Sequence, residues 1–314
     1  MPQLPPGLSV IIPAYKSGGM LPDLVQRLSL ALDATGLAYE VILANDGSPD
    51  NTWSVIQQLA AEHPRVRGIC LMRNYGQQNA LLAGIRAASF DTIMTMDDDL
   101  QHPPEEIPKL LAKLSEGFDV VYGPPESEQH GLLRDLGSVI TKIGLQSVMG
   151  AETARMVSAW RVFRTMLRDA FAGFNGPYVN LDVLLTWATS RFGAVRLRHD
   201  PRAAGESNYN LRKLIRHSLN MITGFSVLPL RFASLVGFVF TFFGVLVLGY
   251  VLTRYFISGS VVAGFPFLAS IIALFSGAQL FALGIIGEYL ARMHFRTMDK
   301  PSYTVRSTTE ASSP

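Results

Sequence analysis

The chain has 314 residues, which is enough for one sizeable α/β domain and an accessory segment. Hydrophobic residues make up 48% of the sequence and charged residues 17%, whereas soluble domains usually carry about 25% charge, so we expect part of the apolar surface to face lipid. The formal net charge of +2 is too small to indicate a nucleic-acid partner. The single cysteine, Cys70, excludes an internal disulfide framework and a cysteine zinc cluster.

Short apolar runs alternate with helical patterns before residue 210. Strands are expected at residues 8–13, 40–44, 66–71 and 92–96, and helices at residues 22–33, 51–63 and 77–88. Strands spaced by helices of this length indicate a parallel, right-handed βαβ sheet. Residues 1–210 are therefore predicted to form a nucleotide-binding α/β domain, whose ligand lies beyond the carboxyl ends of the strands.

The composition changes after residue 210. Residues 211–230 mix basic and apolar side chains, which favours an amphipathic helix in the lipid headgroup layer, although a solvated helix packed on the domain fits the same pattern. Residues 231–257 and 261–290 each contain an uncharged run long enough to cross a hydrocarbon core about 30 Å thick. We therefore predict two transmembrane helices, followed by a tail at residues 291–314.

The charged flanks of the two apolar runs predict the topology. The link between the runs carries one basic residue, Arg254, whereas basic residues cluster on the outer flanks: Arg212, Lys213, Arg216, Arg231, Arg292, Arg296 and Lys300. The positive-inside rule then places both flanks and both termini in the cytoplasm. The N-terminal residues lack the pattern of a signal peptide. We expect a multi-pass protein of the inner (plasma) membrane with a cytoplasmic catalytic domain and a disordered polar tail from Ser307.

Three adjacent carboxylates, Asp97, Asp98 and Asp99, follow the fourth expected strand. They repel one another unless a divalent cation lies among them, and Mg²⁺ or Mn²⁺ prefers such oxygen ligands. In an extended chain Asp97, Asp99 and Gln101 point to one side and Asp98 to the other. The pattern thus predicts a metal that neutralises a diphosphate; the alternative is a polar loop with helix caps.

A second polar turn, at residues 45–48, follows the second expected strand. Asp46 can accept hydrogen bonds from a base or ribose there. Gly47 supplies the tight turn and Ser48 or Asp50 caps the next helix. Turns of this kind are common, so a purely structural role is the alternative.

These two motifs and four further stretches carry a family resemblance: residues 9–15, 73–77, 205–209 and 287–289. Together they resemble family 2 glycosyltransferases of the GT-A fold, in the polyprenyl-phosphate branch, and within it the aminoarabinose-transferase subgroup. The resemblance runs from near residue 8 to about residue 304. It implies inverting transfer from a nucleotide-sugar, a UDP-sugar, to polyprenyl (undecaprenyl) phosphate for cell-envelope modification, and a homo-tetramer.

The resemblance also implies roles for individual residues. Asp97 and Asp99 are implied to be catalytic as metal ligands, with Gln101 as a third ligand. Substrate is implied to contact the following residues: Pro13, Tyr15, Asp46, Asp98, Arg134, Arg161, Arg202 and Ser207. Arg202 suits phosphate because a guanidinium binds it in a fork, although a plain surface arginine is the alternative. Asp182 either orients the acceptor or a sugar hydroxyl, or caps its own helix.

Three departures from the family pattern limit what is implied. Lys16-Ser17 stand where the family usually has Asn-Glu, and Asn208 replaces a lysine that would contact phosphate. Ser158-Ala159 precede Trp160 and Arg161 without the family's carboxylate, so no base is inherited there. A strong base is also unnecessary, because a phosphate monoester with a second pKa near about 6 is already ionised at neutral pH.

Two rival functions remain. A processive polysaccharide synthase would need more than two spans and commonly carries a Gln-x-x-Arg-Trp motif, which the sequence lacks. An inactive membrane scaffold of the same fold would not need the intact Asp97, Asp99 and Gln101. Both are less consistent with the sequence than a polyprenyl-phosphate glycosyltransferase.

Overall fold

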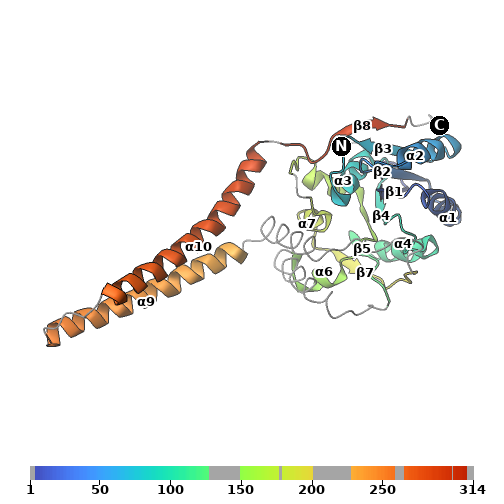
Figure 1. Cartoon of the computed structure of the whole chain (residues 1–314). Coiled ribbons are helices and arrows are strands. Elements are labelled where there is room, and N and C mark those ends of the chain that lie inside the picture. The colour runs from blue at the N-terminus through green and yellow to red at the C-terminus, as the bar shows by residue number, and fades with distance from the viewer. Residues whose placement is uncertain are drawn as a thin grey trace. The chain divides into compact units, whose positions relative to one another are not determined.

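The computed structural model describes residues 4–126, 149–176, 179–200, 228–258, 265–298 and 300–309. The chain divides into two compact units (Figure 1). We call Met1–Arg216 with Asp299–Pro314 the sheet unit and His217–Met298 the hairpin unit. Several expected features lie outside the described residues: Arg134, Arg202, Ser207 and residues 211–227 of the expected amphipathic helix.

The first half of the sheet unit alternates strands and helices as the sequence predicts. Its elements are β1 (Leu8–Ala14), α1 (Leu21–Asp33), β2 (Tyr39–Asn45), α2 (Thr52–Glu62), β3 (Val66–Leu71), α3 (Gln77–Ala87) and β4 (Thr92–Thr95). All seven expected elements are confirmed, each end within one residue. Strands β1 and β2 are buried at every position, as expected of central strands covered on both faces.

The second half of the sheet unit is shorter in its elements and mixed in strand direction. It contains η1 (Pro104–Glu106), α4 (Ile107–Ser115), β5 (Val120–Tyr122), α6 (Ala151–Met156), β6 (Arg161–Arg164), η2 (Thr165–Phe171), α7 (Leu181–Thr186), β7 (Phe192–Ala194) and β8 (Val305–Thr308). The eight strands lie in the order β7-β5-β6-β4-β1-β2-β3-β8. Strand β6 is antiparallel to β4 and β5, and β8 is antiparallel to β3, while the remaining pairs are parallel.

Helices cover both faces of this sheet. One apolar cluster joins α1, α2 and α4 to one face, and a second joins α3, η2 and α7 to the other. The result is a three-layer α/β/α sandwich with a mostly parallel sheet (Figure 1). Parallel strands β1 to β4 end at the same edge, so the loops that follow them meet there.

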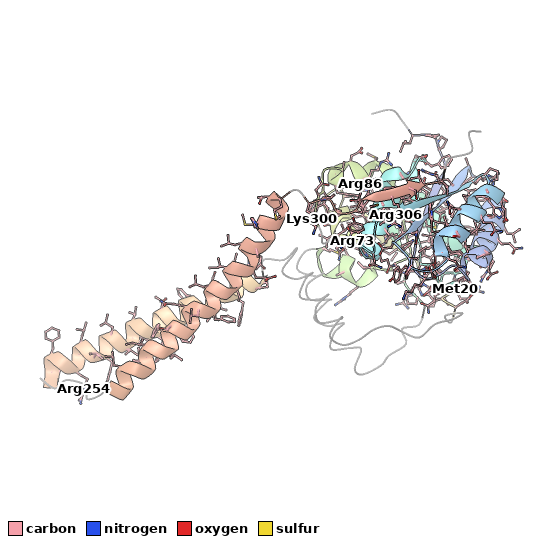
Figure 2. The ribbon with its side chains drawn as sticks, turned by 45° about the horizontal axis from the view of Figure 1, so that its top comes forward. Met20, Arg73, Arg86, Arg254, Lys300 and Arg306 are labelled. Atoms are coloured by element: carbon pink, nitrogen blue, oxygen red, sulfur yellow. The ribbon has the colours of Figure 1, made fainter. Side chains whose placement is uncertain are left out.

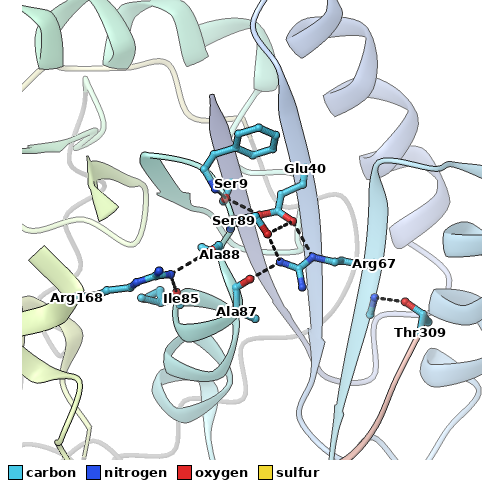
Figure 3. Close-up of polar contacts among 11 residues, drawn as sticks. Ser9, Glu40, Arg67, Ile85, Ala87, Ala88, Ser89, Arg168 and Thr309 are labelled. Atoms are coloured by element: carbon cyan, nitrogen blue, oxygen red, sulfur yellow. Dashed lines mark hydrogen bonds and ion pairs between the residues drawn. The ribbon is translucent and has the colours of Figure 1, made fainter. Parts of the chain in front are cut away.

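A buried carboxylate fastens the opposite edge of the sheet. Glu40, at the start of β2, is 9% exposed. Its Oε1 accepts hydrogen bonds from Ser9 Oγ (2.6 Å) and Ser89 N (2.7 Å), and its Oε2 pairs with Arg67 Nε (2.7 Å; Figure 3). Burial of a charge is unfavourable unless it is paired and hydrogen-bonded. Glu40 meets both conditions and links β1, β2, β3 and the segment after α3.

The hairpin unit contains two long apolar helices, α9 (Leu228–Ser258) and α10 (Phe265–Thr297). Among the described residues they supply two candidate membrane spans, Pro229–Arg254 and Leu274–Ala291, by length and composition. Two edge-to-face ring pairs, Phe232–Phe281 and Phe240–Phe275, show that the helices run antiparallel. Both expected apolar helices are present.

The C-terminal residues form an ordered edge strand. Strand β8 pairs with β3, and Met72 N donates to Thr304 O (2.9 Å) just beyond it. Disorder beginning at Ser307, which the polar composition predicts, is therefore wrong through Thr309. Composition could not reveal this pairing, because an edge strand needs only a partner with free backbone groups.

Candidate functional site

The candidate site lies at the edge where β1, β2, β3 and β4 end. Two non-glycine residues have positive φ angles there: Lys16 (57°), after β1, and Leu100 (60°), after β4. Such conformations cost free energy and are concentrated at functional sites. The two strained positions mark the loops that carry Tyr15 and the three aspartates.

Asp46 holds the β3–α3 loop, residues 72–76, by two charged hydrogen bonds. Its Oδ1 accepts from Tyr75 N (2.7 Å) and its Oδ2 accepts from Gly76 N (2.8 Å). Burial raises the pKa of Asp46, and these two hydrogen bonds oppose the rise. Asp46 is thus a structural anchor of the loop, and its expected contact with a nucleotide stays a prediction.

Gly47 allows this close approach. Its φ is +61°, and a Cβ at this position would lie 2.3 Å from the carbonyl carbon of Arg73. A side chain would therefore be disfavoured by both the backbone conformation and the space. The turn after β2 and the β3–α3 loop can touch only because residue 47 is glycine.

The acidic segment is bent. Strand β4 ends at Thr95, and bends follow at residues 98–100, so the extended run expected through Asp97 and Gln101 is wrong. Asp97 Oδ1 accepts from Gln77 Nε2 (2.6 Å) at the start of α3. Asp99 is 6% exposed, and its Oδ1 accepts from Gln101 N (3.2 Å). The bend is the physical reason for the error, because Leu100 reverses the chain with a left-handed φ.

The three carboxylates disfavour one another's charge. Burial raises the pKa of Asp97 to about 6, and the charges of Asp99 and Asp98 add to the rise. Burial also raises the pKa of Asp98, which a hydrogen bond from the Tyr15 backbone opposes. A divalent cation would offset this repulsion. The donor set therefore fits a hard cation.

The described residues do not form a complete metal centre by themselves. No three His, Cys, Asp or Glu side chains among them converge with ligand geometry. Mg²⁺ is usually held by one or two carboxylates together with water and substrate phosphates. Asp97 and Asp99 match that incomplete type of site.

Two histidines beside the acidic segment were missed by sequence reasoning. His102 stacks on Trp160 with ring centroids 5.0 Å apart, and His199 meets His102 edge-on at 4.9 Å. Burial lowers the pKa of His102 to about 3, and its Nδ1 accepts from Asp97 N (3.3 Å). His102 lies three positions after Asp99, so its place in the sequence could have indicated a site residue. Nothing in the sequence around His199 indicates one.

His199 has one ring nitrogen without a partner. Burial lowers the pKa of His199, which a hydrogen bond to the Gly123 backbone and the charge of Asp99 partly oppose. Its Nε2 is buried and finds no hydrogen-bond partner among the described residues. The lowered pKa favours the neutral imidazole.

Arg161 and Asp182 bind each other in the second half of the sheet unit. Their side chains are 2% and 9% exposed and form an ion pair, and Tyr122 Oη donates to Asp182 Oδ1 (3.0 Å). Burial raises the pKa of Tyr122, so the phenol stays a donor. The expected phosphate contact of Arg161 and acceptor contact of Asp182 stay predictions.

Asp182 is not the cap of its helix. Asn180 occupies the N-cap of α7, and its Oδ1 accepts from Val183 N (3.1 Å). The capping role considered for Asp182 is therefore wrong, because Asn180 supplies the cap and the Asp182 carboxylate binds Arg161 and Tyr122 instead. This leaves Asp182 to its contacts with Arg161 and Tyr122.

The remaining described candidates lie on the same edge. Pro13 is buried within β1, whereas Tyr15 beyond it is 44% exposed, with the Lys16 ammonium 5.6 Å from its ring centroid. The structure therefore groups six of the predicted residues around the strand ends: Pro13, Tyr15, Asp46, Asp97, Asp98 and Asp99. Arg134, Arg202 and Ser207 are not among the described residues.

Comparison with known proteins gives a family match and a full-length relative. The model of a family described as "Glycosyl transferase family 2" matches residues 9–171. The chain is 35% identical over 303 residues to a protein of Shewanella sediminis named undecaprenyl-phosphate 4-deoxy-4-formamido-L-arabinose transferase. That alignment covers 95% of this chain and 91% of the relative.

Solved structures share the fold of the sheet unit at low sequence identity. Glucosyl-3-phosphoglycerate synthase of Mycobacterium tuberculosis, in complex with Mn²⁺, UDP-glucose and phosphoglyceric acid, matches with a TM-score of 0.53 at 18% identity. Its complex with Mn²⁺, UDP and glucosyl-3-phosphoglycerate matches with a TM-score of 0.52 at 19% identity. Each match covers 69% of this chain and 78% of the solved chain, and each supports the GT-A-like α/β fold.

Proposed function

The chain belongs to glycosyl transferase family 2, and from this premise we propose that it transfers a glycosyl group from a nucleotide-sugar to polyprenyl phosphate. The observation that carries the proposal is the extent of the similarity to the Shewanella transferase. It covers 95% of this chain and so includes the two apolar helices as well as the sheet unit. An enzyme acting on a membrane lipid needs both parts.

The donor is proposed to bind at the edge where β1 to β4 end. The exposed ring of Tyr15 offers a stacking surface for the base. Asp46 and Gly47 fix the β3–α3 loop around it. This matches the rule that ligands of open α/β sheets bind beyond the carboxyl ends of the strands.

A divalent cation, Mg²⁺ or Mn²⁺, is proposed to bind Asp97, Asp99 and Gln101. The cation would neutralise charge on the leaving diphosphate. Gln77 orients Asp97, and Gln101 N orients Asp99, so the chain holds both carboxylates in place.

The reaction proposed is a single inverting displacement. An oxygen of the acceptor phosphate forms a bond to the anomeric carbon while the bond from that carbon to the nucleoside diphosphate breaks. The phosphate oxygen is already ionised near neutral pH, so no proton has to be removed by a strong base. The protein's part is positioning and electrostatic stabilisation, with Asp182 proposed to orient the acceptor side.

Both ends of the hairpin unit are proposed to face the cytoplasm. Because β8 pairs with β3, the chain before α9 and the chain after α10 fold into one unit and must lie on one side of a membrane. Two antiparallel spans satisfy this requirement. The basic outer flanks then place the sheet unit in the cytoplasm and the Arg254 link outside.

Mass spectrometry of the lipid product tests the proposed function. The purified full chain is incubated in detergent with undecaprenyl phosphate, a panel of UDP-sugars and either Mg²⁺, Mn²⁺ or EDTA. We expect one sugar to be added per lipid phosphate, and only with a divalent ion. A polymeric product would indicate a processive synthase, and no product with any donor would indicate an inactive scaffold; either result overturns the proposal.

A further inference from the structure

The C-terminal segment, residues 300–309, is built into the sheet unit beyond a single strand pairing. Thr309 N donates to Gly68 O (3.0 Å), and Gly68 N donates to Thr309 Oγ1 (2.7 Å; Figure 3). At the other end Met72 N donates to Thr304 O (2.9 Å), which extends the contact to the start of the β3–α3 loop. The segment therefore runs beside β3 from Gly68 to Leu71 and reaches the start of the β3–α3 loop.

Ser302 fastens this segment to the loop that precedes α7. The residue is 2% exposed. Its Oγ accepts from Gly176 N (3.1 Å) and donates to Gly176 O (2.9 Å). A single hydroxyl thus satisfies both backbone groups of one residue. Gly176 lies four positions before Asn180, the N-cap of the helix that carries Asp182.

Thr304 fastens the same segment to the β3–α3 loop. Its backbone O accepts from Met72 N (2.9 Å), and its side chain lies beside the hydroxyl of Tyr75, where it lowers the pKa of that phenol. The backbone N–H of Tyr75 is one of the two donors held by Asp46. The rings of Tyr75 and Tyr303 both pack on the apolar cluster beneath α3. Tyr75 is therefore held at its backbone by Asp46 and at its ring end by the C-terminal segment.

Basic side chains surround these two tyrosines. The guanidinium of Arg73 lies over the Tyr75 ring at 4.4 Å, and that of Arg86 lies over the Tyr303 ring at 5.6 Å. Arg306 Nη2 donates to Met72 O (2.8 Å). Figure 2 labels these cations together with Lys300. Their positive charges should attract an anionic donor that binds at the β3–α3 loop.

We propose that Ser302 and Thr304 are positioning residues for nucleotide binding, which tie the β3–α3 loop and the loop before α7 into one arrangement. The inference rests on the proposed donor site. A loop that already has its bound conformation loses little conformational entropy when the ligand binds. The apparent affinity for the ligand is therefore higher. The residues act through Tyr75 and Gly176 and do not themselves touch the donor.

Four single variants of the full-length protein in detergent test this role. Binding of uridine diphosphate is measured by titration calorimetry with Mg²⁺ present. Ser302→Ala removes two hydrogen bonds and Thr304→Val removes the hydroxyl beside Tyr75, so each should weaken binding about threefold to tenfold. Thr304→Ser keeps the hydroxyl and should restore binding to within about twofold. Ser307→Ala is the matched control: it also replaces a serine by alanine, but on β8, and it should leave the Kd for uridine diphosphate unchanged.

Thermal stability separates positioning from a purely structural role. If Ser302→Ala and Thr304→Val lower the Tm but leave the Kd for uridine diphosphate at the wild-type value, the inference is wrong. It is equally wrong if Ser307→Ala weakens binding as much as Ser302→Ala. If Ser302→Ala fails to fold, Thr304→Val and Thr304→Ser still test the inference, because Thr304 is exposed. The lipid transfer assay is run in parallel: wild-type binding of uridine diphosphate without any lipid glycosylation would refute the proposed acceptor, while the Kd values would still decide the positioning role.

Discussion

The two halves of the sheet unit build their parts of the site in different ways. In the first half, the carboxylates proposed to act follow parallel strands: Asp46 comes directly after β2, and Asp97 is separated from the end of β4 by Met96. Their partners come largely from nearby loops and include backbone N–H groups. In the second half, Arg161 of β6 and Asp182 of α7 are buried against each other and against Tyr122 of β5.

The two arrangements should respond differently to substitution. Asp97, Asp98 and Asp99 repel one another and are proposed to lie at a cation site, so loss of Asp97 or Asp99 should remove activity and spare the fold. The charges of the second half neutralise each other in a buried position, so loss of one leaves the other unpaired. Variants in the first half should therefore be compared by activity, and variants in the second half by stability.

The largest effect is expected from Asp99→Asn. The substitution keeps the size of the side chain but removes a charge that the proposed cation needs, so lipid transfer should fall about a hundredfold to a thousandfold. The Tm should be unchanged or slightly higher, because one of three repelling carboxylates is gone. Glu62→Gln, at the exposed end of α2, is the matched control and should transfer at the wild-type rate. Retained transfer by Asp99→Asn would refute the metal assignment.

Arg161→Met should have the largest effect on stability. It leaves the buried Asp182 without its ionic partner, and breaking a buried pair in this way costs about 3–5 kcal/mol. Thermal unfolding of the full chain in detergent measures the loss. The double variant Arg161→Met/Asp182→Leu should regain most of it, because no unpaired charge remains.

The double variant also shows whether the pair takes part in the reaction. If it recovers the wild-type Tm but not transfer activity, Arg161 or Asp182 has a role in the reaction beyond the ion pair. If it is no more stable than Arg161→Met alone, the charges do not support each other and the contrast between the two halves fails.

The same contrast explains what the sequence could predict. All seven elements of the first half follow from hydrophobic periodicity and turn residues, which are local properties. The aspartates were found because three like charges in a row after an apolar strand are unusual. The pairing of Arg161 with Asp182, the approach of His199 to His102 and the β8 strand join distant residues. Arg306, for example, contacts Met72 across 234 positions. No local pattern encodes such a contact.

Gly47→Ala should have an intermediate effect that falls on the donor site. The added Cβ would meet the Arg73 backbone at 2.3 Å, so the β3–α3 loop must move, at a cost of about 1–3 kcal/mol beyond the backbone strain. Binding of uridine diphosphate should weaken together with the Tm. Gly36→Ala is the matched control: its φ is +69° but nothing lies within 4 Å, so only the strain of about 1–2 kcal/mol is expected, with no change in binding. Equal effects of the two variants would contradict the proposed close approach.

Asn180→Ala should have the smallest effect on the Tm. It tests the second half of the sheet unit at the N-cap of α7. The Val183 N–H loses its acceptor, and loss of such a cap costs about 1 kcal/mol. Asn180→Asp keeps an acceptor at the same place and adds a charge that the positive end of the helix favours, so it should match or exceed the wild-type Tm. If Asn180→Ala proved neutral, the cap would have to come from another group, and Asp182 would again be a candidate for it. If instead the loss is seen and Asn180→Asp restores it, Asn180 is the cap of α7, and the contacts of Asp182 are those with Arg161 and Tyr122, on which the stability of this half depends.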